Sequence, residues 1–81
     1  MKLKVRLFAV ARQLAGADQI TLDVPDPCTA NQLREILARE VPALEAVLPQ
    51  ILLAVDSDYV QGNTVIPSDA EVACIPPVSG G

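Results

Sequence analysis

The sequence contains no histidine and no tryptophan, and its 81 residues include only two cysteines, Cys28 and Cys74. Without histidine, the chain lacks both the commonest general base and the commonest metal ligand. The two cysteines are too few and too far apart for an iron–sulfur or zinc pattern, so we expect each to be a small buried hydrophobic residue. Because there is no glycine-rich phosphate loop either, the chain offers no metal site and no conventional catalytic site, and we expect it not to be an enzyme on its own.

Long hydrophobic runs are also missing. The longest, Ile51 to Val55, is far shorter than the ~20 residues that span a bilayer. At the N-terminus, Lys2, Lys4 and Arg6 alternate with apolar residues, which differs from the compact apolar block of a signal peptide. We therefore expect a cytoplasmic protein with no membrane partner, and this location argues against a disulfide between the two cysteines.

The second half of the chain has no basic residues. From Glu40 onward it contains acids and no Lys or Arg, within a net charge of −4. Phosphate binding requires clustered Lys and Arg, so we expect no nucleic-acid partner. The acidic half fits a partner protein with a basic surface, because opposite charges steer encounter, but it fits a solvated face equally well. These acids are Glu40, Glu45, Asp56, Asp58, Asp69 and Glu71.

The chain does have enough aliphatic residues for the core of one small domain, since 51% of it is hydrophobic. Residues 2–7 alternate between basic and apolar, which predicts a strand with one buried face. Residues 8–15 are rich in helix formers, and Gly16 is a plausible C-terminal cap. Residues 20–24 alternate again and are close enough in sequence to the first strand to pair with it antiparallel.

The clearest predicted helix begins after Thr29, a favoured N-cap that can form a capping box with Gln32. A short turn-rich segment follows it through residues 43–48. Residues 51–55 are nearly all apolar, which predicts a strand covered on both faces in the middle of a sheet. Residues 59–60 and 71–75 are expected to form two further strands. The apolar face of the helix consists of Leu33, Ile36, Leu37 and Val41.

Strands on both sides of one amphipathic helix predict an α+β domain, with a mixed sheet and the helix packed across one face. Because the first and last strands flank the helix in sequence, both can lie centrally and pair in parallel. That arrangement is the β-grasp, or ubiquitin-like, fold. We expect residues 1–75 to form this domain and residues 76–81 to form a flexible, extended C-terminal tail.

The tail reads Pro76-Pro77-Val78-Ser79-Gly80-Gly81. The two prolines stiffen its start, and the two glycines at its end carry no side chains. At about 3.3 Å per residue, an extended tail reaches roughly 20 Å, enough to enter a deep pocket of another protein. Since the chain has no other credible site, the α-carboxylate of Gly81 is the candidate reactive group. A carboxylate is inert until adenylation by ATP converts it to a mixed anhydride.

Several motifs resemble the family of small, sulfur-carrying subunits of molybdopterin synthase. The tail is the most specific of them, and the resemblance covers essentially the whole chain. Two loops depart from the family pattern: Asp56 stands where an Asn is expected, and Ser68-Asp69-Ala70 replaces an Asp-Gly-Asp turn. The supporting motifs are Phe8-Ala9-x-x-Arg12-x-x-x-Gly16, Leu52-Leu53-Ala54-Val55, Tyr59-Val60 and Glu71-Val72-Ala73.

The resemblance implies a mechanism. An ATP-dependent activating enzyme adenylates Gly81, sulfur transfer makes it a thiocarboxylate, and Gly80 lets the chain pass a narrow slot. A larger catalytic subunit accepts the tail and uses its sulfur on cyclic pyranopterin monophosphate to build the molybdopterin dithiolene. The implied assembly is a heterotetramer of two small and two large subunits, and the small subunit holds no permanent cofactor. Pro76, Pro77, Val78 and Ser79 would insert with the tail, and Phe8, Arg12, Tyr59 and Ile75 would contact the partner.

Three other functions stay open from the sequence. A thiamine-pathway sulfur carrier would use the same tail chemistry with a different acceptor. A ubiquitin-like protein modifier would join Gly81 to a lysine through an isopeptide bond. A plain β-grasp binding module would leave the tail without a role.

Overall fold

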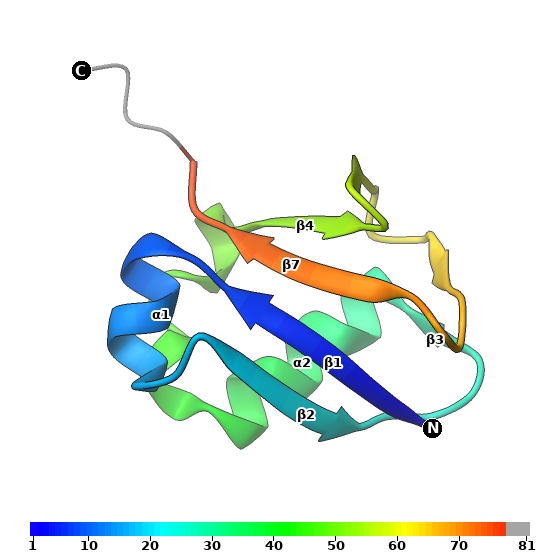
Figure 1. The fold of residues 1–81 in the computed structure, drawn as a ribbon, viewed down its shortest axis with the longest axis horizontal. Coiled ribbons are helices and arrows are strands. Elements are labelled where there is room, and N and C mark those ends of the chain that lie inside the picture. Colours follow the sequence, from blue (N-terminus) through cyan, green and yellow to red (C-terminus); the bar gives the residue numbers. More distant parts are fainter. Residues whose placement is uncertain (78–81) are drawn as a thin grey trace.

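The computed structural model describes residues 1–77, and residues 78–81 lie outside the described part. Its main layer is a five-stranded mixed sheet in the order β2-β1-β7-β4-β5, and the helix α2 lies across one face of that sheet (Figure 1). This confirms the predicted α+β, ubiquitin-like fold. The elements are β1 Lys2–Leu7, α1 Ala9–Ala15, β2 Gln19–Asp23, β3 Cys28–Thr29, α2 Ala30–Glu40, the 3-10 turns η1 Pro42–Leu44 and η2 Leu48–Gln50, β4 Leu52–Val55, β5 Asp58–Tyr59, β6 Val65–Ile66 and β7 Glu71–Ile75.

The first and last strands pair in parallel in the interior of the sheet. Val5 of β1 lies opposite Val72 of β7, and β1 pairs antiparallel with β2 on its other side. Both pairings are as the sequence predicts. Alternate residues of β1 point to opposite faces, so Leu3, Val5 and Leu7 are buried against the helical layer while the basic residues between them are exposed.

The helix α2 begins at the predicted capping box. The Thr29 Oγ1 accepts a hydrogen bond from the Gln32 backbone N–H at 3.2 Å, and the Gln32 Oε1 accepts one from the Thr29 N–H at 2.8 Å. The reciprocal pair satisfies two backbone donors at the start of the helix. Leu33, Ile36 and Leu37 are buried in the core, as their spacing predicts, and they hold α2 against the sheet.

The prediction that residues 51–55 form a strand covered on both faces is wrong at Leu52. β4 lies between β7 and β5, but only the face that carries Leu53 and Val55 is covered by helices. Leu52 points to the other, open face and is 45% exposed. An apolar run therefore marks a strand here without showing that both of its faces are buried.

A second, two-stranded sheet was not predicted from the sequence. β3 pairs antiparallel with β6, with Cys28 opposite Ile66 and Thr29 opposite Val65. Both strands have two residues, too few for an alternating pattern to show in the sequence. The pairing connects the start of α2 to the loop that leads into β7. No helix among residues 1–77 is long and apolar enough to cross a membrane.

Candidate functional site

The open face of the sheet, opposite α2, carries a shallow hollow. Its floor contains Ala54 of β4 and Ala73 of β7, which are paired across the two strands. Two small side chains side by side leave space that larger neighbours would fill. The hollow has a volume of about 380 Å³. We call it the docking hollow, and it is lined by Arg6, Phe8, Ala54, Asp56, Ser57, Tyr59, Glu71, Ala73 and Ile75.

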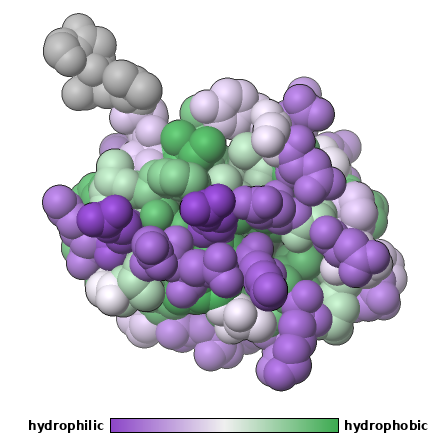
Figure 2. All heavy atoms as spheres, viewed as in Figure 1, coloured by the Kyte–Doolittle hydropathy of each residue, from purple (hydrophilic) through white to green (hydrophobic). Residues whose placement is uncertain are grey.

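Three of the predicted contact residues meet at the docking hollow. Tyr59 on β5 is 65% exposed and Phe8, just after β1, is 42% exposed, while Ile75 at the end of β7 is half-buried. In Figure 2, hydrophobic residues gather on this face beside the point where the chain leaves β7. Exposed aromatic side chains around a hollow are typical of a protein-binding surface.

The backbone around Phe8 explains its position. Phe8 is extended and its N–H donates to the Cys74 carbonyl at 3.3 Å, so it continues the β1–β7 pairing by one residue. It therefore shares the open face with Arg6, and the helix α1 begins only at Ala9, one residue later than predicted. The Arg6 guanidinium lies 5.9 Å from the centre of the Phe8 ring. The predicted cap is confirmed, because Gly16 ends α1 at φ +73°.

Arg12, the fourth predicted contact residue, lies elsewhere. It is an exposed residue of α1 and does not line the docking hollow. The structure therefore groups Phe8, Tyr59 and Ile75 and leaves Arg12 on the neighbouring helix.

The predicted tail begins at the edge of the docking hollow. Ile75 is the last residue of β7 and lines the hollow, and Pro76, which follows it, is half-buried while Pro77 is exposed. The other predicted tail residues, Val78, Ser79, Gly80 and Gly81, lie outside the described residues.

The polar rim of the hollow was not predicted from the sequence. An Arg6 Nη1 donates to a Glu71 Oε1 at 3.2 Å across the paired strands β1 and β7. The Asp56 Oδ1 accepts a hydrogen bond from the Glu71 backbone N–H at 3.0 Å. Of these residues, only Arg6 could have been placed near the hollow from the sequence. It lies two residues before Phe8 in an alternating strand, so both side chains should point to the same face of the sheet.

The turn between β4 and β5 is strained. Asp56 and Ser57 occupy its two central positions with φ of 49° and 73°. Positive φ at both positions is the signature of a type I′ hairpin turn, which prefers Asn-Gly or Asp-Gly. Since Ser57 is not glycine, its left-handed backbone carries a cost of roughly 1–2 kcal/mol.

We expect Ser57→Gly to stabilise the protein by about 0.5–1 kcal/mol, because relief of left-handed strain exceeds the added entropy of the unfolded glycine. Urea unfolding of both proteins measures the difference. The matched control is Ser68→Gly, in a turn where no positive φ occurs, and it should not be stabilising. A Ser57→Gly protein that is less stable than the wild type would contradict the assigned turn.

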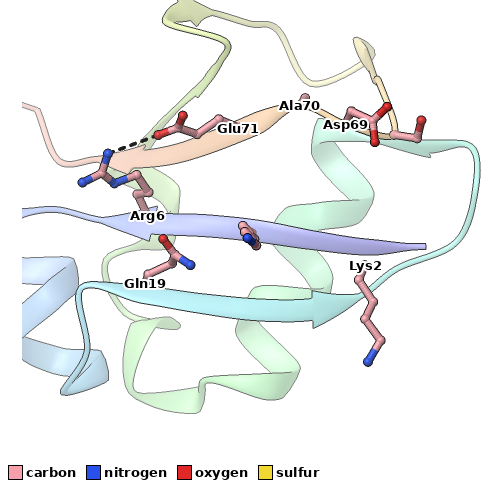
Figure 3. Close-up of a pocket in the computed structure, with 8 residues that line it drawn as sticks. Lys2, Arg6, Gln19, Asp69, Ala70 and Glu71 are labelled. Carbon is pink, nitrogen blue, oxygen red and sulfur yellow. Dashed lines mark hydrogen bonds and ion pairs between the residues drawn. The ribbon is translucent and has the colours of Figure 1, made fainter.

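A polar trough lies beside the docking hollow on the same face. It is lined mainly by β1 and by the loop that leads into β7, and Arg6 and Glu71 lie between it and the hollow (Figure 3). Lys2 lies 4.0 Å from Asp23 on β2. The trough also contains Lys4 and Asp69, so positive and negative groups are present in similar number along it.

Both cysteines are buried and unpaired with each other, as expected of small hydrophobic residues. Burial raises the pKa of the Cys74 thiol to about 11, and the positive charge of Arg34 opposes this to a lesser extent. The pKa of Cys28 is also raised by burial. Since the thiolate is the nucleophilic form, neither residue is suited to carry sulfur chemistry.

The mixed sheet and the helix across one face define a ubiquitin-like protein. The chain belongs to the ThiS family, whose model matches residues 5–81. A molybdopterin synthase sulfur carrier subunit of Arabidopsis thaliana is 36% identical over 81 residues, which cover 100% of this chain and 84% of the relative.

Two solved structures show the same fold. SAMP1 from Haloferax volcanii has a TM-score of 0.87 and 26% identity, with 100% of each chain covered. A complex of subunits 1 and 2 of the molybdopterin-converting factor from Helicobacter pylori contains a chain with a TM-score of 0.72 and 23% identity, again over 100% of each chain.

Proposed function

We propose that this protein is the sulfur-carrier subunit of a molybdopterin synthase. The observation that carries the proposal is the match, over the whole chain, to a relative named for that role. The position of the docking hollow supports it, because the chain leaves β7 directly beside the hollow. A partner bound there would receive the residues that follow Ile75.

In the proposed reaction, the Gly81 carboxylate attacks the α-phosphate of ATP on an activating enzyme, and pyrophosphate leaves. Sulfur at the oxidation level of hydrosulfide then displaces AMP from the acyl adenylate with loss of a proton, which leaves a thiocarboxylate at Gly81. The large subunit uses this sulfur on cyclic pyranopterin monophosphate, and two such transfers complete the dithiolene. The carrier itself contributes no catalytic side chain and no bound cofactor, and the reaction takes place in the cytoplasm.

The docking hollow is the proposed contact for the large subunit. Phe8, Tyr59 and Ile75 would pack against its apolar side chains, and Arg12 would contribute from α1 at the margin. In the assembly we propose, two large subunits form the centre and one carrier binds at each end. The Helicobacter pylori complex supports a partner of this kind, since it pairs subunit 1 with subunit 2.

A ubiquitin-like protein modifier is the second candidate, because SAMP1, which is named a small archaeal modifier protein, is similar over its whole length. A thiamine-pathway carrier would share the thiocarboxylate but not the large subunit. Mass spectrometry of the protein purified from its native cells separates these functions. The proposal predicts a fraction with one oxygen replaced by sulfur at Gly81 and co-purification with the large subunit. Lysine conjugates as the main product would contradict it.

Tyr59→Ala is expected to weaken binding to the large subunit by at least about tenfold, because an exposed aromatic anchor is lost from the centre of the contact. Isothermal titration calorimetry measures the Kd. The matched control is Val65→Ala on β6, which removes a 55% exposed apolar side chain that does not line the docking hollow. Equal affinity of the Tyr59→Ala protein and the wild type would remove Tyr59 from the interface.

A further inference from the structure

The charges around the docking hollow are uneven. Arg6 is the cation in its lining, and it is already engaged by Glu71 at 3.2 Å and by the ring of Phe8. Asp56 lies on the rim. Asp58, in contrast, is paired with Val55, so it belongs to the other face of the sheet and does not line the hollow. Within residues 1–77, Asp56 has no Lys or Arg nitrogen within 4.0 Å. The apolar hollow therefore has an uncompensated negative edge.

The carboxylate of Asp56 is held at this edge by the fold. Its backbone N–H donates to the Glu71 carbonyl at 2.9 Å, and its Oδ1 accepts from the Glu71 N–H at 3.0 Å. Both bonds fix the turn against the first residue of β7. The negative charge thus has a defined position next to Tyr59, which is paired with Ala54 on the floor of the hollow.

The polar trough shows that this imbalance is local to one half of the open face. There, Arg6 is bonded to Glu71 (Figure 3). Lys2 lies near Asp23, and Lys4 shares the trough with Asp69. The trough needs no charged partner. The hollow differs, because covering its apolar floor would also remove water from the unpaired Asp56 carboxylate beside it.

We propose that the protein that covers the docking hollow places a lysine or arginine against Asp56, beside the apolar side chain that fills the hollow. Burying a carboxylate without a counter-charge is costly, and opposite charge across an interface speeds encounter. A second copy of this chain does not fit, because the Arg6 that it would present in a symmetric contact is already paired with Glu71. The proposal rests on the proposed function, in which the occupant is the large subunit.

The test compares two variants of the full chain that have equal net charge. Asp56→Asn removes one negative charge at the rim, and the amide oxygen introduced there can still accept the bond from the Glu71 N–H. Glu45→Gln removes one from an exposed residue that does not line the docking hollow. Each variant changes the formal net charge from −4 to −3, since one acid is lost. Stopped-flow mixing with the large subunit measures the association rate at ~0.01 M and ~1 M salt, where the Debye length is about 30 Å and about 3 Å.

The Asp56→Asn protein is expected to associate about threefold more slowly than the wild type at low salt, with most of the difference lost at high salt. The Glu45→Gln protein should remain within about 1.5-fold of the wild type. Equal rates for both variants would overturn the proposal, because only total charge would then matter. Self-association of the wild type that Tyr59→Ala abolishes would also overturn it. If the wild type does not bind the large subunit at all, the proposed function fails first, and the rim proposal fails with it.

Discussion

Deleting Gly81, or adding one residue after it, is expected to abolish sulfur transfer while the midpoint of thermal unfolding stays nearly unchanged. The reactive group of the proposed carrier is a single α-carboxylate, so either change moves it out of register with the activating enzyme. The hydrophobic core of the described residues ends at Cys74, well before this position. Each protein is incubated with the activating enzyme, ATP and a sulfur source, and mass spectrometry measures how much thiocarboxylate forms.

A control variant tests whether sulfur transfer depends on the position of the terminal carboxylate or on the side chains of the tail. Ser79→Ala alters the tail without changing its length, and it should keep most of the activity. A fall in the unfolding midpoint after Gly81 deletion would show that the terminus contributes to the fold. Undiminished thiocarboxylate formation in the deletion protein would exclude Gly81 as the sulfur-bearing residue.

Leu37→Ala is expected to have the largest effect on stability. Leu37 is fully buried on α2, and removing a buried leucine side chain costs about 2–5 kcal/mol. A domain of this size has a total free energy of unfolding of roughly 4–12 kcal/mol, so much of it would be lost. Urea unfolding followed by circular dichroism measures the change.

The matched control for this change is Leu52→Ala. Leu52 is 45% exposed on the open face, so the same truncation should cost less than about 1 kcal/mol. If the two variants lost equal stability, the assignment of an open and a covered face to the sheet would be wrong.

The sequence predicted the parts of the fold that rest on local periodicity and capping. The alternation in β1 and the Thr29–Gln32 box are such features, and both are confirmed. It could not show that Leu52 is exposed, because an apolar run has the same composition whether one or both faces of its strand are covered. The pairing of β3 with β6 joins residues far apart in sequence, and no local pattern encodes it.

The candidate site was predicted in a similar, partial way. Phe8, Tyr59 and Ile75 come from the end of β1, from β5 and from β7, and the structure brings them together around one hollow. The Arg6–Glu71 pair and the hydrogen bond to Asp56 depend on the register between strands, which fixes which side chains face each other. The register between these strands depends on the tertiary structure, so the residues of the rim could be identified only from the structure.

The parallel pairing of β1 with β7 also limits when the protein can fold. β7 lies between β1 and β4, yet it is the last strand to be synthesised. While the ribosome is still adding residues before Glu71, the sheet lacks its middle strand, and β1 has no neighbour on that side. Contacts of such long sequence separation form slowly and together. The sheet is therefore complete only after β7 has been made, and a fragment that stops before Glu71 has no strand to join β1 to β4.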